Sequence, residues 1–289
     1  MVFDIERFYS KVNPPYQRKY NNIQQEPPKA PVVFTGASIN GEIDAFYQQK
    51  AGDCKLLALL KSISLTDWGK KGIKKAVKPD GMGGAYVTFK GAKGEQKEFH
   101  ITIEDFFKAE NDGVYSIGDD DVLAIELAAV KYLKTQGIIV GEAGLQGYDV
   151  SKLGENELGT LLFGEDYQAK DYFIAEDIER ILEIIEKEPG KYAATFGVIL
   201  EMGENSYGHD LTLKGVEIKD GKKYVTFFDP HNSEDERMVD YNEFLSQWKC
   251  SIRLYGIDPK EDNRKLMDDF ERTKLKFGLL NRLFPHNKQ

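Results

Sequence analysis

The sequence predicts an α+β fold in which a helical first part precedes an antiparallel, β-rich second part. Apolar residues recur at helical spacing in three segments, over 54–63, 122–132 and 175–188. Beyond residue 190 the pattern changes to alternating apolar and polar residues, which is typical of half-buried strands. Asp220-Gly221 stands between two such runs, and this dipeptide is a strong β-hairpin signal.

Composition and charge exclude several classes of protein. The 289 residues are 41% hydrophobic and 30% charged, as in a globular protein with a real core. The net charge of -9 argues against a nucleic-acid partner, because such proteins usually present a basic face. The sequence has no apolar run long enough to span a bilayer and no Sec-type signal peptide. We therefore expect a soluble protein made in the cytoplasm, with no membrane partner, and signal-independent secretion stays compatible with the sequence.

The first part of the chain divides into an extension and a helical subdomain. Residues 1–40 are rich in Pro, Gln and Asn, which favours an extended arm. Residues 41–165 form the expected helical subdomain, whose first two helices flank a β-hairpin over 85–103. The glycine-rich stretch 137–164 lacks phosphate-loop spacing, so we expect loops around a cleft there. The basic run 68–78 indicates a solvated helix face or loop.

The second part is predicted to be a β-rich subdomain over residues 166–258. Its helix over 175–188 ends at Pro189-Gly190, and strand-like segments follow, among them "YAATFGVIL" and "SQWKCSIRLYG". Residues 259–289 close the chain, with charges interspersed among apolar residues at helical spacing. This pattern predicts an amphipathic C-terminal helix.

Cys54 is the first candidate for chemistry, because it follows an Ala-Gly-Asp turn and opens an apolar helix. With only Cys54 and Cys250 in the chain, a reducing compartment or a catalytic thiol fits better than a disulfide framework. A free cysteine is often just a small buried hydrophobe, whereas a helix N-terminus favours the thiolate. The choice depends on partners, since a thiol nucleophile needs a base, a group that orients the base, and donors for the oxyanion.

His209 is the candidate base, because "SYGHDLTL" puts it at the start of an alternating strand, where it can face a cleft. Its other interpretation is a hydrogen-bonded edge histidine. If residues 220–221 form a two-residue turn, simple counting sets His209 opposite Asn232. One β-bulge would shift the register and bring Asp229 to the face of the histidine instead. Asp229 and Asn232 therefore both stay open as the orienting group.

The stretch "QQKAGDCKLLALL" resembles the active-site motif of the calpain-like branch of papain-fold cysteine proteases. The order Gln, Cys, His, then Asn or Asp before Pro matches as well, and the similarity covers about residues 41–255. The resemblance implies a papain-like fold with the active site between the two subdomains. It also implies that Cys54 is the nucleophile, that His209 is the base, and that Gln48 and the Cys54 backbone N–H form the oxyanion hole. Asp229 then takes the place of the family's asparagine.

Three positions depart from the family pattern. Lys55 stands where a tryptophan is usual, Asp210 follows the histidine where a small residue is usual, and His231 replaces a tryptophan that shields the triad. No acidic calcium loop can be matched, so calcium dependence is not implied. The expected chemistry requires no cofactor, and the expected partner is a protein or peptide substrate. The N-terminal arm and the C-terminal helix are each candidates for an autoinhibitor in the cleft.

From the sequence we therefore expect a calpain-like cysteine endopeptidase that works through an acyl-enzyme. The resemblance also implies a thiolate-imidazolium pair between Cys54 and His209, because the histidine of papain lowers the pKa of its partner thiol in this way. The same residues would serve a protein deamidase or transglutaminase that acts on glutamine side chains. A third alternative is a binding protein on a protease fold without turnover, for which Lys55 and His231 argue.

Overall fold

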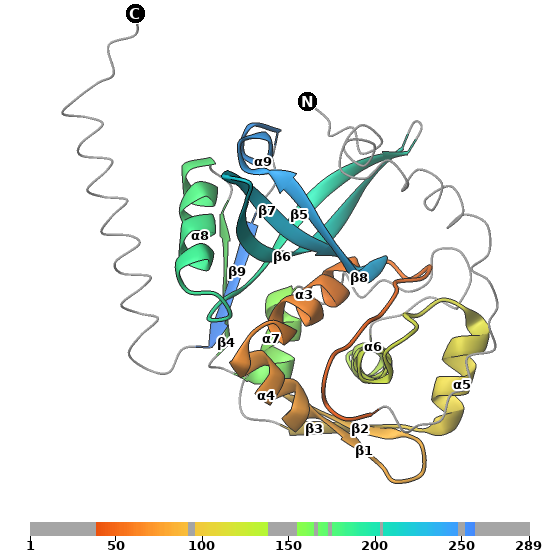
Figure 1. The fold of residues 1–289 in the computed structure, drawn as a ribbon. Helices are drawn as coiled ribbons and strands as arrows, with labels where there is room; N and C mark the ends of the chain where they lie inside the picture. The colour runs from red at the N-terminus through yellow and green to blue at the C-terminus, as the bar shows by residue number, and fades with distance from the viewer. Residues whose placement is uncertain are drawn as a thin grey trace, which may run out of the picture.

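The protein has an α+β architecture with two antiparallel sheets, as the computed structural model shows (Figure 1). The expected N-terminal arm and C-terminal helix fall almost entirely outside the part of the chain that the structure describes. The described residues are 39–91, 96–137, 155–164, 167–172, 175–202, 205–247 and 252–257. Among them, no helix is long and apolar enough to cross a bilayer.

The first part of the chain contains most of the described helices and a three-stranded sheet with the order β1-β2-β3. The helices predicted over 54–63 and 122–132 and the hairpin predicted over 85–103 are confirmed. The elements are α3 (Cys54–Ser64), α4 (Asp67–Ala76), β1 (Val77–Pro79), β2 (Ala85–Lys90), β3 (Gln96–Ile101), α5 (Ile103–Asp112), α6 (Asp120–Thr135) and α7 (Glu155–Phe163).

The second part is dominated by a six-stranded antiparallel sheet with the order β4-β9-β5-β6-β7-β8. Its helix α8 confirms the helix predicted over 175–188. The elements are β4 (Tyr167–Tyr172), α8 (Ala175–Lys187), β5 (Ala193–Met202), β6 (Asn205–Lys219), β7 (Lys222–Asp229), β8 (Asn232–Asp240), α9 (Tyr241–Gln247) and β9 (Ile252–Ile257).

Two hydrophobic clusters hold these elements together, and α3 connects the helices of the first part to the larger sheet. One cluster gathers around α3 and α6, and the other lies between α8 and the larger sheet. Helix α3 packs against β5 and β6 of that sheet as well as against α4, α6 and α7 (Figure 1). Its apolar residues are completely or almost completely buried, namely Leu56, Leu57, Leu59, Leu60 and Ile63. The first residue of α3 is Cys54, so this packing fixes the position of the thiol.

The expectation of loops over 137–164 was wrong for its last part, where α7 forms a helix over 155–163. Residues 138–154 lie outside the described part of the chain. The glycine-rich composition hid the helix, but Gly159 has a packing role there. A Cβ at this position would lie 1.9 Å from the ring of Tyr167, so only glycine lets the helix approach that ring. The basic run is a solvated helix face as predicted, since the lysines of α4 are exposed.

The β6–β7 hairpin has the two-residue turn that the Asp-Gly pair predicts, with Lys219 paired to Lys222. Asp220 and Gly221 have φ angles of 53° and 73°, as a turn that matches the strand twist requires. The register then shifts between Leu213 and Gly215, so that Thr212 pairs with Phe228 rather than with Asp229. This bulge decides which residue reaches the candidate base.

Candidate active site

The bulge in β6 resolves the choice between Asp229 and Asn232. Side chains alternate between the two faces of a strand, so a one-residue shift moves a residue to the other face. His209 is buried, and its Nε2 lies 3.0 Å from Oδ1 of Asp229. Asn232 accepts a hydrogen bond from the backbone of Glu234 and, within the described residues, makes none with His209. The simple register was therefore wrong, and the bulged alternative describes the structure.

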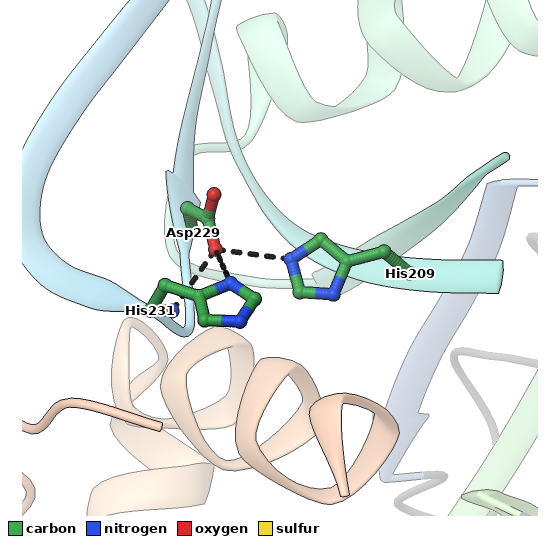
Figure 2. Close-up of side chains that lie close together, drawn as sticks. All are labelled: His209, Asp229 and His231. Atoms are coloured by element: carbon green, nitrogen blue, oxygen red, sulfur yellow. Dashed lines mark hydrogen bonds and ion pairs between the residues drawn. The ribbon is translucent and has the colours of Figure 1, made fainter. Parts of the chain in front are cut away.

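Asp229 is the centre of a buried polar cluster rather than the partner of one histidine. Oδ1 also accepts hydrogen bonds from the backbone N–H and Nδ1 of His231, at 2.9 and 3.0 Å (Figure 2). Oδ2 accepts from Nη1 of Arg237 at 2.9 Å. Burial alone would raise the pKa of Asp229, but the neighbouring His209 and His231 hold that pKa well below its usual value. Asp229 is thus a carboxylate that can keep two imidazoles oriented.

The orientation of the two histidine rings leaves one nitrogen of each turned away from Asp229 (Figure 2). The ring centroids are 4.7 Å apart, and the planes are tilted by 37°. Because Nε2 of His209 binds the carboxylate, Nδ1 is the nitrogen that stays available for a proton. A base held by a buried carboxylate through its other nitrogen is the usual arrangement of a hydrolytic triad.

Cys54 lies at the N-terminus of α3 and is partly exposed. Its Sγ contacts Oδ2 of Asp210 at 4.0 Å, and within the described residues no hydrogen bond joins it to His209. Burial, followed by the charge of Asp210, raises the pKa of the Cys54 thiol to about 12. Both effects favour the neutral thiol, whereas the thiolate-imidazolium pair that the resemblance implies stays a prediction. Burial is the larger cause, and the aspartate directly after the histidine is the second.

Gln48 belongs to a loop that is hydrogen-bonded to the turn after Asp229. The backbone N–H of Gln48 donates to the carbonyl of Pro230, and Ser233 donates to the carbonyl of Phe46. The buried side chain of Gln48 donates from Nε2 to the carbonyl of Ala51, which uses one of its two N–H groups. The candidate oxyanion donor and the orienting carboxylate are therefore joined through the backbone.

A buried threonine attaches the strand of the candidate base to the helix of the candidate nucleophile. Thr212 lies in β6, and its hydroxyl donates to the carbonyl of Ala58 in α3 at 2.8 Å. Thr212 is completely buried, so this hydrogen bond is shielded from water. This hydrogen bond fixes the position of β6 along the axis of α3. It therefore also fixes the distance between His209 and Cys54.

Two further carboxyl groups are buried beneath the start of α3. Asp53 precedes Cys54 and Glu126 lies in α6. Both residues are almost completely buried. Burial and the charge of Glu126 raise the pKa of Asp53 well above its usual value, and burial raises the pKa of Glu126 as well. Ser116 donates to Glu126 from its hydroxyl and its backbone. The raised pKa values favour a proton on this pair, because two charged carboxylates buried close together would repel each other.

Among the described residues, one group of side chains could hold a metal ion, and it lies in this site. It consists of His209, Asp229 and His231. Their ligand atoms all lie within 4.8 Å of one another. Both imidazoles donate to one carboxylate oxygen, however, and Arg237 brings a fixed positive charge to the other. The atoms that would bind a metal ion are therefore already used in hydrogen bonds. The arrangement suits proton transfer better than it suits the binding of a metal cation.

Sequence reasoning missed Arg237, which is buried in β8 and balances the charge of Asp229. It lies in "NSEDERMVD", where an arginine among acidic residues is typical of an ordinary exposed ion pair.

In comparisons with known proteins, no family model matches the chain, and a search of the curated proteins finds no similar sequence. The site must therefore be interpreted from its own geometry.

Proposed function

We propose that this protein is a papain-like cysteine hydrolase of the calpain-like type that cleaves peptide bonds. The observation that supports this most strongly is the buried pair of His209 on β6 and Asp229 on β7. Strand β6 is hydrogen-bonded through Thr212 to the helix that begins at Cys54. A thiol, an imidazole and an orienting carboxylate are the three parts of a nucleophilic triad. In this proposal Asn232 has no catalytic role.

The reaction begins when Nδ1 of His209 takes the thiol proton and Cys54 Sγ attacks the carbonyl carbon of the substrate. Asp229 stabilises the imidazolium that forms, because its carboxylate is charged and binds the opposite nitrogen. The imidazolium then donates its proton to the leaving amine, which leaves an acyl group on sulfur. A water molecule, deprotonated by His209, hydrolyses this thioester and restores the thiol.

The oxyanion of the tetrahedral intermediate would be bound by the backbone N–H of Cys54 and by Gln48. The N–H of the Gln48 amide that does not bind Ala51 is the donor that we assign to the oxyanion; the same side chain also acts on the buried carboxyl of Asp53 and lowers its pKa, against the larger rise caused by burial. Removal of one such donor commonly costs about 3 kcal/mol of transition-state stabilisation. The hydrogen bond between Gln48 and Pro230 keeps this donor in register with Asp229.

The test is incubation of an unfolded protein with the wild type, with Cys54→Ala and with Cys250→Ala, read by intact mass and peptide mapping. The proposal predicts backbone cuts with the wild type and Cys250→Ala but none with Cys54→Ala. A mass gain of about one unit on uncut substrate would instead identify deamidation by the same triad. Equal cutting by Cys54→Ala, or no reaction of any kind by the wild type, would refute the proposal.

A further inference from the structure

Asp210 is an acidic residue whose side chain contacts the candidate nucleophile, and the triad does not use it. It follows His209 on β6, and its Oδ2 lies 4.0 Å from Sγ of Cys54. Among the described residues, no cationic group lies within 4.0 Å of its carboxylate, although Lys55 and His209 influence it at longer range. Burial raises the pKa of Asp210, as is typical of a carboxylate that lacks a close partner.

The cationic side chains nearby do not pair with the carboxylate of Asp210. The side chain of Lys55 is exposed and, within the described residues, pairs with neither Asp210 nor Asp171. The guanidinium of Arg253 is held by both carboxylate oxygens of Asp171. The site therefore has a partly buried carboxylate beside the sulfur, and none of the residues that the structure describes provides a counterion in contact with it.

A carboxylate without a counterion disfavours ionisation of the neighbouring thiol. A thiolate at Cys54 would lie next to a second negative charge, and the charge of Asp210 is one cause of the raised pKa of the thiol. A cation that enters the site and binds Asp210 would remove this penalty. The same cation would form a charge-assisted hydrogen bond, which is stronger than a neutral one.

We propose that Asp210 is a specificity residue that selects substrates with an ammonium or guanidinium group close to the scissile bond. This inference rests on the proposed function, because it describes how that site chooses its substrate. A lysine or arginine side chain would bind Asp210 and at the same time make the neighbouring thiol easier to ionise. Cationic substrates therefore gain in both binding and turnover, by about 10- to 100-fold in kcat/KM over a neutral isostere.

The first measurement tests the electrostatic effect of Asp210 on Cys54 and does not require that the protein cleave a substrate. Cys54 is modified with methanethiosulfonates that carry a trimethylammonium, a neutral or a sulfonate group, in a Cys250→Ser background and at low salt. We expect the cationic reagent to react faster than the anionic one, and Asp210→Asn to reduce this ratio by about tenfold. The matched control is Asp220→Asn at the tip of the β6–β7 hairpin, which makes the same change of charge and keeps the wild-type ratio.

The second measurement compares N-acetylated peptides with lysine or its neutral isostere norleucine on either side of the cut. The wild type should prefer lysine, whereas Asp210→Asn should lose the preference and cut the norleucine peptide at least as fast as the wild type does, because the charge that disfavours the thiolate is gone. Peptides with a free N-terminus distinguish the two sources of an ammonium group, since a preference seen only there would assign Asp210 to the chain end.

The outcomes separate this inference from the proposed function. A reagent ratio that is unchanged in Asp210→Asn, or a lysine preference that survives in this variant, overturns the role of Asp210. A wild type that cuts none of the peptides, yet shows the expected reagent ratio, refutes the peptidase and leaves a cation-selective thiol site.

Discussion

Replacement of Arg237 by methionine tests whether the Asp229 cluster is balanced as the structure indicates. Nη1 of Arg237 lies 2.9 Å from Oδ2 of Asp229, and the two side chains are only 3% and 1% exposed. Methionine keeps much of the length of the side chain but removes its charge and its donors. Asp229 would then remain buried as an anion with only its two histidines. Loss of one partner from a buried ion pair costs about 3–5 kcal/mol.

We take the lower end of this range, about 3 kcal/mol, because His209 and His231 still bind the other oxygen of Asp229. At about 2–4 °C per kcal/mol for a chain of this size, the melting temperature should fall by about 6–12 °C. The assay is urea and thermal unfolding at pH 7. The matched control is Lys214→Met, since Lys214 pairs with Glu236 in a partly exposed position and should cost no more than about 1 kcal/mol.

The pH dependence of the same variant gives the reasoning a second test. The pKa of Asp229 is held below its usual value in the folded protein, so its contribution to stability is present above about pH 4 and is lost as the pH falls. Once Asp229 is protonated, Arg237 has no anion to balance. The difference between wild type and Arg237→Met should therefore shrink only as the pH falls below about 4. A loss below 1 kcal/mol at pH 7, or a difference that grows in acid, would refute the balanced cluster.

Further predictions concern the orienting group, the contact between strand and helix, the buried carboxyls and metal. Asp229→Ala should lower kcat by at least about 100-fold, whereas Asn232→Ala should stay within a few-fold; equal losses in steady-state assays would contradict the assignment. Thr212→Val and Thr226→Val each remove a buried hydroxyl and should each cost about 1 kcal/mol in urea unfolding, but only Thr212→Val should also lower kcat, because only Thr212 binds α3. Because the pKa of Asp53 is raised, its contribution to stability is lost as the pH rises above about 4; Asp53→Asn should therefore stabilise the protein more at pH 8 than at pH 5, and the opposite order would show that Asp53 is not protonated. Prolonged treatment with EDTA should leave cleavage unchanged, and lost activity that Zn²⁺ or Ca²⁺ restores would assign a metal to the histidine cluster.

Local patterns in the sequence predicted most of the elements that position the site. The apolar run after Cys54, the alternating segments of the larger sheet and the Asp-Gly turn each have a direct physical signal, and each is found in the structure. Helix α7 was missed because its glycine is typical of a loop, whereas the fold uses that position for close contact with Tyr167. Packing between distant segments decides such a case, and a single sequence does not record it.

The site was predictable in its residue types but not in its contacts. Counting from the turn gave the wrong partner for His209, since the bulge near residue 214 has no clear sequence signature. The sequence did mark Asp210 and His231 as unusual, yet not that one would contact the thiol and the other would share Asp229. Nothing in the sequence distinguished Arg237 from a surface arginine, because its burial depends on β8 pairing with β7.

The central claim, that Cys54 is a nucleophile served by His209, is tested most directly by labelling with a biotinylated peptidyl epoxide. Wild type and His209→Ala are compared by the rate of labelling, and the modified residue is located by peptide mapping. We predict labelling of Cys54 and not of Cys250, at a rate about 100-fold lower in His209→Ala. Labelling of both cysteines at similar rates, with no effect of His209→Ala, would contradict the account.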